Sequence, residues 1–281
     1  MNLQRIAAFA DGDRGGNPAG VVIADTLPPH TEMQRIAAEI GYSETVFAAP
    51  APGGWQVRYF SPEGEVAFCG HATIALGAEL GRRFGPGRHA LSLSQAEISV
   101  EVDAGRAVLT SPPTHSARLE TAVAVAVLEA FGLTEADLDP RLPLSRAHGG
   151  VDHAVIALRR RDRLAAMAYP FDRVKALMHK AGLTTISLIH IAAPDLFIAR
   201  NAFAIGGVVE DPATGAAAAA LGGLLVDLGW PGLAAGGRFT IRQGEDMGAP
   251  SLIAVEVSGQ PGAPVRVGGA ARPILGPATS A

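Results

Sequence analysis

An internal repeat constrains this chain more than any other feature of its sequence. Residues 70–80 read GHATIALGAEL and residues 215–225 read GAAAAALGGLL, so glycine, alanine and leucine coincide at matched positions. Each stretch follows a strand-like segment and an acid-bearing loop, and each precedes further strand-like segments. Self-similarity of this kind is typical of one supersecondary unit present twice. The sequence therefore predicts two copies of a single α/β unit.

Short segments rich in Val, Ile and Phe, separated by Gly and Pro, predict strands along the whole chain. Gly77, Gly222 and Gly223 fall inside predicted helices, where each costs about 1 kcal/mol relative to alanine. We interpret them as places where strands wrap closely around a central helix. Thr31 is placed to cap the first helix, and a strand is expected to stop at Ser111-Pro112-Pro113. Helical periodicity predicts helices at 31–41, 68–84, 117–132, 172–182 and 212–229.

Composition excludes several classes of protein. With 48% apolar and 18% charged residues, the chain is globular, and its 281 residues leave room for two domains. A net charge of −4 and the lack of a basic stripe argue against nucleic-acid binding. A single cysteine, Cys69, excludes an internal disulfide. We see neither a signal-peptide pattern nor an apolar run long enough to cross a membrane, so a soluble cytoplasmic protein with no membrane partner is expected.

The start of the second repeated helix carries unusual chemistry. Residues 210–215 read EDPATG, and Asp211 and Thr214 are placed to cap the helix while Gly215 leaves room for a ligand near the backbone. The beginning of a helix presents unpaired N–H groups and a positive dipole end. Two such units facing each other would bring two helix N-termini to one cleft. We therefore expect a site for an anion, most simply a substrate carboxylate.

An ordered set of motifs resembles the PhzF-like phenazine-biosynthesis isomerase family, which is related to diaminopimelate epimerase. The resemblance extends from about residue 5 to about residue 270. The motifs are Asn17-Pro18, GYSET at 41–45, RYFSP at 58–62, EVAFCGHAT at 65–73, EDPATG at 210–215 and Gln243-Gly244.

This resemblance implies a mixed α/β fold of two pseudo-symmetric domains, each a curved sheet or barrel around a central helix. The domains are expected at 1–114 and 115–264, with a last strand at about 265–276 returning to the first. The resemblance also implies a cleft between the domains, no metal or organic cofactor, and often a homodimer.

The resemblance assigns a role to several residues. Glu44 corresponds to the glutamate that moves a proton on a cyclic substrate, and His71 and Asp211 line the same cleft. Ala216 departs from the family, which commonly has serine after Thr-Gly, so the substrate of the phenazine enzyme is not implied. The residues expected to bind substrate are Asn17, Gly70, Thr214, Gly215, Ala216 and Gln243.

Each candidate also has a structural interpretation. Glu44 can close a turn, His71 can be a capping or core histidine, and Asp211 can be an N-cap with Pro212 at the first helical position. Cys69 aligns loosely with a catalytic thiol of diaminopimelate epimerase, but alanines occupy position 216 and beyond where a partner thiol is needed, so we interpret it as a small buried residue.

The remaining histidines show no metal-ligand spacing, so no metal is predicted. The sequence thus predicts a cofactor-independent isomerase or epimerase that moves a proton on a small carboxylate-bearing molecule. The alternative is a catalytically inactive ligand-binding or interaction protein of the same fold.

Overall fold

The structure is a computed structural model that describes residues 2–94 and 97–274. These residues form two compact units. The N-terminal unit comprises residues 2–110 and 268–274, and the C-terminal unit comprises residues 111–267. No helix within the described residues is both long and apolar enough to cross a lipid bilayer.

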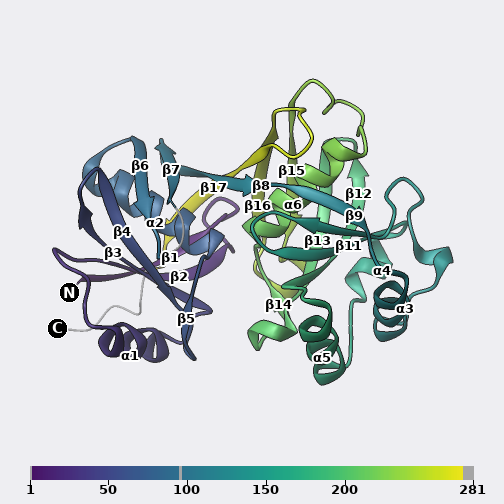
Figure 1. The fold of residues 1–281 in the computed structure, drawn as a ribbon, viewed down its shortest axis with the longest axis horizontal. Helices are drawn as coiled ribbons and strands as arrows, with labels where there is room; N and C mark the ends of the chain where they lie inside the picture. Colours follow the sequence, from purple (N-terminus) through teal and green to yellow (C-terminus); the bar gives the residue numbers. More distant parts are fainter. Residues whose placement is uncertain (1, 95–96, 275–281) are drawn as a thin grey trace. The chain divides into compact units, whose positions relative to one another are not determined.

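The N-terminal unit is a closed barrel of eight strands, with a ninth short strand on its rim (Figure 1). Around the barrel the strands run in the order β17, β1, β2, β3, β4, β6, β7 and β8, and β8 pairs with β17 to close the ring. The short β5 pairs with β4. The bounds are β1 Asn2–Ala8, β2 Asn17–Ile23, β3 Glu44–Ala51, β4 Gly54–Phe60, β5 Glu65–Val66, β6 Gly87–Ser92, β7 Glu97–Asp103, β8 Arg106–Pro113 and β17 Pro264–Pro273.

The C-terminal unit repeats this sheet. Its strands pair in the order β9, β10, β11, β12, β13, β15 and β16, and the short β14 pairs with β13 as β5 does with β4. The bounds are β9 His115–Arg118, β10 Ser145–His148, β11 Asp152–Leu158, β12 Thr185–Ala193, β13 Leu196–Ala202, β14 Glu210–Asp211, β15 Gly237–Gln243 and β16 Ser251–Val257.

The internal repeat is confirmed strand by strand. From β1 to β7 the successive pairs are antiparallel, parallel, antiparallel, parallel and antiparallel, and the same sequence of pairings runs from β10 to β16. Each short strand leads into the repeated helix, which is α2 (Gly70–Phe84) in one unit and α6 (Gly215–Asp227) in the other. The expected fold, two related α/β units each built around a central helix, is therefore correct.

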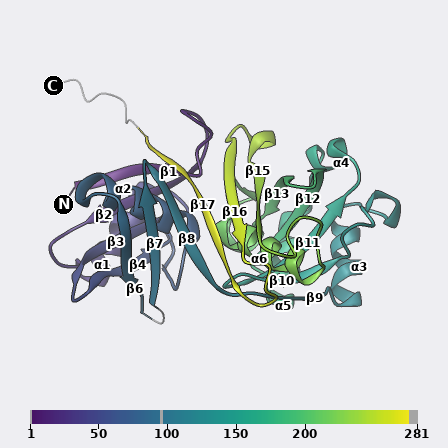
Figure 2. The ribbon, with the colours of Figure 1, turned by 90° about the horizontal axis from the view of Figure 1, so that it is seen from above.

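The helix glycines lie where strands approach most closely, as predicted. A Cβ added to Gly77 would lie 2.5 Å from Cγ2 of Val100 in β7, and one on Gly222 would lie 3.1 Å from Cγ1 of Val255 in β16. Gly223 meets the Oγ1 of Thr114 at 2.4 Å in the same way. Helix α6 is buried on almost every side and runs beside β10 and β16 (Figure 2). Any larger side chain at these positions would push the strands away from the helix.

Amphipathic helices cover the outer faces of the sheets. Helix α1 packs Met33 and Ala37 against β3 and β4, and α5 packs Val174 and Met178 into a core that includes Ile156 of β11. These helices have one apolar side because only that side meets a sheet. Their bounds are α1 His30–Ile40, α3 Thr121–Ala130, α4 Arg161–Ala165 and α5 Phe171–Ala181, with short 3-10 turns η1 Glu135–Asp137, η2 Ala204–Gly206 and η3 Glu245–Met247.

Strand β8 ends at Pro113, within the Ser111-Pro112-Pro113 stretch where a strand was expected to stop, and the C-terminal unit begins at Ser111. Two other local predictions are wrong. Helix α1 begins after Pro29, so Thr31 lies inside the helix and does not cap it. Helix α6 begins at Gly215 rather than at residue 212, because Pro212 lies in the loop between β14 and α6. The Gln243 side chain holds this loop by hydrogen bonds to the backbone of Asp211 and Thr214.

Candidate active site

The N-terminal unit brings Glu44 and His71 together. Glu44 is the first residue of β3, and His71 is the second residue of α2. The Glu44 Oε2 lies 3.4 Å from the His71 Nε2, and the two side chains are 13% and 7% exposed. This buried carboxylate oxygen has no hydrogen-bond partner in the structure. A buried acceptor without a hydrogen bond costs free energy, so this oxygen is a candidate for binding a ligand or a proton.

Cys69 contacts the same imidazole. Its Sγ is 3.3 Å from the His71 Nδ1 and 3.9 Å from the Nε2, and the Nε2 also faces Glu44 and, at 3.4 Å, the Ser43 Oγ. Glu44, Cys69 and His71 therefore offer three donor atoms within 4.8 Å of one another. The Glu44 Oε2 and the Cys69 Sγ both lie close to the His71 Nε2, so the three groups form one cluster in which a proton can be exchanged.

The first turn of α2 is open to an anion. The first intrahelical bond runs from the Thr73 N–H to the Cys69 carbonyl, and the Cys69 side chain forms no cap. The N–H groups that precede it have no partner within the helix. They carry the positive end of the helix dipole and lie directly beside His71.

The C-terminal unit joins Asp211, Thr214 and Gln243. The Thr214 hydroxyl donates to the Asp211 Oδ2 at 2.5 Å, and the Gln243 Nε2 donates to the Asp211 carbonyl at 2.7 Å and to the Thr214 Oγ1 at 3.0 Å. The Gln243 Oε1 in turn accepts from the Thr214 N–H at 3.2 Å. Gln243 is 1% exposed and its amide is engaged on both sides, so in this structure it shapes the loop rather than presenting a free group.

The capping prediction for this helix is wrong. Thr214 is the N-cap residue, but its hydroxyl is bonded to Asp211 and Gln243 and makes no cap hydrogen bond. Asp211 lies in β14, four residues before the first helical residue. The two side chains that were expected to close the helix instead bond to each other, and the first N–H groups of α6 have no side-chain cap.

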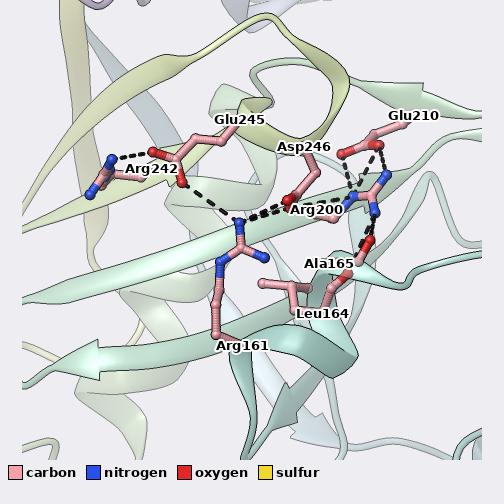
Figure 3. Close-up of polar contacts among 8 residues, drawn as sticks. All are labelled: Arg161, Leu164, Ala165, Arg200, Glu210, Arg242, Glu245 and Asp246. Atoms are coloured by element: carbon pink, nitrogen blue, oxygen red, sulfur yellow. Dashed lines mark hydrogen bonds and ion pairs between the residues drawn. The ribbon is translucent and has the colours of Figure 1, made fainter.

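An ion-pair network fixes the strand that carries Asp211 (Figure 3). The Arg200 Nε donates to the Glu210 Oε1 at 3.0 Å, and its NH1 donates to the Ala165 carbonyl at 2.7 Å. The Arg200 and Glu210 side chains are 11% and 4% exposed. The Asp246 carboxylate lies between Arg200, at 4.0 Å, and Arg161, at 2.9 Å. The hydrogen bonds that Arg200 donates to Glu210 raise the pKa of Arg200, which therefore stays charged.

Matching the two units by strand register shows how far they have diverged. Tyr59 and Val66 pair as Asn201 and Asp211 do, so Asp211 corresponds to Val66. By the same register Glu44 corresponds to Thr185, His71 to Ala216, and Cys69 to Thr214. No catalytic candidate has a copy of itself in the other unit. The position that a partner thiol would occupy is therefore 214, a threonine, rather than the alanines considered from the sequence.

Sequence reasoning missed a second buried polar chain. The His153 Nδ1 lies 2.8 Å from the Thr185 Oγ1, and that hydroxyl lies 3.4 Å from the Asn201 Oδ1. His153 is fully buried, and burial lowers its pKa to about 3, so it is neutral. The three residues lie on three adjacent strands and are far apart in the sequence, so only the register of the sheet reveals them.

The other predicted residues lie at the starts of β2, α2 and α6. Asn17 is 2% exposed at the start of β2, and Gly70 is the first residue of α2. Gly215 and Ala216 form the start of α6, with Ala216 partly exposed. Glu44 and His71 are therefore together in one unit, whereas Asp211, Thr214 and Gln243 are together in the other. That all of them share one cleft remains a prediction.

Comparisons with known proteins give the context for this site. Residues 6–275 match the family described as phenazine biosynthesis-like protein. An uncharacterised isomerase of Deinococcus radiodurans is 33% identical, over 95% of this chain and 90% of that protein. Trans-2,3-dihydro-3-hydroxyanthranilate isomerase of Pseudomonas fluorescens is 32% identical, over 92% of this chain and 91% of its own. The crystal structure of a PhzF-family phenazine biosynthesis protein from Bacillus anthracis has the same fold, with a TM-score of 0.86 at 21% identity over 98% of both chains.

Proposed function

This chain belongs to the phenazine biosynthesis-like protein family, and from that premise we propose that it is a cofactor-independent isomerase acting on a small, carboxylate-bearing cyclic molecule. Its curated relatives are named as isomerases, which supports the reaction class. One relative acts on trans-2,3-dihydro-3-hydroxyanthranilate, a ring that carries a carboxylate. The substrate of this chain belongs to the same chemical class.

The Glu44 carboxylate carries the proposal, through its buried oxygen Oε2. Its Oε2 is buried, lacks a hydrogen-bond partner and lies 3.4 Å from the His71 Nε2. A positioned carboxylate removes a proton from a carbon that a neighbouring carboxylate has made acidic, and returns a proton at another position of the same molecule. His71 assists by exchanging a proton with Glu44 or the substrate, and Asp211 assists from the second unit.

The divergence of the two units favours one base over two. A symmetric racemase needs an acid–base group on each side of its substrate. Glu44 corresponds to Thr185, and Cys69 corresponds to Thr214, and threonine hydroxyls are not bases at neutral pH. Moving one proton between two carbons on the same face of a ring requires only Glu44 and its relay.

The substrate carboxylate binds at helix N-termini in this proposal. Neither α2 nor α6 has a side-chain cap, so the first N–H groups of each helix can donate to an anion. The same groups stabilise negative charge as it develops on the substrate. We expect both N-termini to face one cleft. A ligand-bound crystal structure with the two helix starts on separate surfaces would exclude a shared site.

The test is proton exchange by Glu44→Gln in deuterated water. The probes are trans-2,3-dihydro-3-hydroxyanthranilate and other small cyclic carboxylates, each followed for deuterium uptake by NMR. Glutamine is nearly isosteric but cannot take a proton, so turnover should fall by about two to four orders of magnitude. Glu63→Gln is the matched control, because Glu63 is exposed in a loop of the same unit.

Thermal melting separates catalysis from folding. The proposal expects Glu44→Gln to melt within a few degrees of the wild type and to retain ligand binding. A variant that melts much lower, with turnover per folded molecule unchanged, would show that Glu44 only closes a turn. Ligand binding by the wild type without any deuterium uptake would favour an inactive binding protein instead.

A further inference from the structure

Three potential metal ligands, none of them among the candidate active-site residues, lie together on the sheet of the C-terminal unit. His148 in β10 pairs with His115 in β9 on one side and with Asp152 in β11 on the other. Residues opposite each other in antiparallel strands share a face of the sheet, so all three side chains lie on one face. Each offers one ligand atom, and these atoms lie within 4.8 Å of one another.

The two imidazole rings lie face to face. The His115 and His148 rings stack with centroids 4.4 Å apart and an interplanar angle of 15°. The His148 Nδ1 lies 2.6 Å from the Asp152 Oδ1. A metal ion that displaces the proton between this nitrogen and this oxygen could be bound by both of them.

The charges around the histidines favour a cation. Arg146 is the neighbouring positive side chain, and it is paired with Glu120 at 3.0 Å and with Asp152 at 3.1 Å. Within this group two carboxylates face one guanidinium. Although burial opposes the shift, hydrogen bonds from His148 and Arg146 lower the pKa of Asp152, so its carboxylate is ionised at neutral pH.

We propose that His115, His148 and Asp152 form a binding site for a divalent transition-metal ion, of which Zn²⁺ is the best suited. Two imidazole nitrogens and one carboxylate oxygen match zinc, nickel or copper rather than calcium or magnesium, which prefer oxygen ligands. Ligand atoms in a tetrahedral zinc site lie about 3.4 Å apart, given bonds of about 2.1 Å. His115 is exposed, so its side chain can rotate to close the remaining distance.

A metal ion at this position would stabilise the part of the sheet, β9 to β11, that packs against α6. It would join β9, β10 and β11 through their side chains, and the β10–β11 hairpin turn packs directly against α6. A Cβ on Gly149 in that turn would lie 2.6 Å from the Ala216 carbonyl and from the Ala220 nitrogen. The proposed ion is therefore structural, and it takes no part in the proton transfer assigned to Glu44.

The test is Zn²⁺ titration by calorimetry on the full chain after chelator treatment. All proteins carry Cys69→Ser, which removes the thiol from the Glu44, Cys69 and His71 cluster and leaves the proposed site intact. We expect one Zn²⁺ per chain, with affinity at least tenfold weaker in His115→Ala and in His148→Ala. His179→Ala is the matched control, because His179 is an exposed histidine of the same unit outside the cluster. It should bind as the parent does.

Two results would overturn the site. One is equal Zn²⁺ affinity in the parent, His115→Ala and His148→Ala, with all three folded by circular dichroism. The other is a parent that binds no Zn²⁺ at all. Co²⁺ provides a second, spectroscopic readout that is independent of calorimetry, because its visible spectrum reports tetrahedral coordination by nitrogen and oxygen. That spectrum should be present in the parent and absent in His115→Ala, whose exposed position makes misfolding an inadequate explanation.

Discussion

Replacing Arg200 by methionine should destabilise the C-terminal unit far more than replacing Arg58 destabilises the N-terminal unit. The two arginines occupy matching positions in the repeat, and each binds the glutamate of the short strand opposite it. The Arg58 Nε donates to the Glu65 Oε1 at 2.7 Å, just as Arg200 binds Glu210. The pairs thus share geometry and topology but differ in burial.

The expected magnitudes follow from that difference in burial. The Arg200 and Glu210 side chains are 11% and 4% exposed, whereas those of Arg58 and Glu65 are 26% and 28% exposed. Removing one partner of a buried pair leaves an uncompensated charge and costs about 3–5 kcal/mol. A solvated pair contributes about 0–1 kcal/mol. Arg200→Met also removes the hydrogen bond to the Ala165 carbonyl, which places it toward the upper end.

The two tryptophans make the assay specific to each unit. Trp55 lies in β4 of the N-terminal unit, and Trp230 is buried in the C-terminal unit, where its Nε1 donates to the Pro194 carbonyl at 2.8 Å. With Trp55→Phe as background, fluorescence in urea reports the unfolding of the unit that contains Arg200. Trp230→Phe isolates the other unit for Arg58→Met.

A double variant checks the physical cause. Arg200→Met with Glu210→Leu removes both charges, and it should recover most of the stability lost in Arg200→Met, because apolar replacements of a buried pair are often neutral. Equal losses for Arg200→Met and Arg58→Met would refute the argument from burial. A double variant no more stable than Arg200→Met would show that the buried charge of Glu210 is not the source of the loss.

Two further predictions concern α2. Gly77→Ala should lower the free energy of unfolding in urea by about 1–3 kcal/mol despite the better helix propensity of alanine, because its Cβ would lie 2.5 Å from Val100. The control Gly64→Ala should leave stability unchanged, because no atom lies within 4 Å of its added Cβ. Equal stability of the two variants would contradict this prediction. Glu79 is buried, which opposes ionisation, yet hydrogen bonds from Arg82 and Arg83 lower its pKa below 4.5. The ionised Glu79 therefore contributes to stability above pH 4.5, and this contribution is lost as the pH falls through the folded-state pKa. The difference in the free energy of unfolding between wild type and Glu79→Gln should be larger at pH 7 than at pH 3. A difference that does not change with pH would contradict the role given to Glu79.

The sequence predicted the features that depend on local pattern and repetition. The helix glycines, the strand–loop–helix order and the matched helices follow from packing rules that leave a mark in the sequence itself. Glu44 and His71 could be singled out because motifs surround them, and the structure places them 3.4 Å apart. The start of α6 was misplaced because Asp211-Pro212 resembles an N-cap followed by proline at the first helical position, whereas Asp211 lies in β14 and accepts from the Thr214 hydroxyl.

Contacts across strands could not be predicted in this way. The Arg200 network joins residues from four elements, and the His115, His148 and Asp152 cluster depends on the register of three strands. Metal-ligand motifs that can be recognised in a sequence have short spacings, whereas His115 and His148 are far apart along the chain. Sequence patterns record neighbours in one element, but a sheet brings together residues whose spacing carries no signal until the pairing is known.

Asp211 offers the sharpest remaining test, because two roles predict different kinetics. Its Oδ2 accepts from the Thr214 hydroxyl, so the side chain holds the loop before α6, and its charge can also act on the substrate. Asp211→Asn retains an acceptor oxygen for Thr214 but removes the charge, whereas Thr214→Val removes the hydrogen bond and keeps the charge. If Asp211 assists proton transfer, Asp211→Asn should lower kcat by about tenfold or more, and Thr214→Val should mainly raise KM. If both variants change only KM, Asp211 positions the loop and the proton moves between Glu44, His71 and the substrate alone.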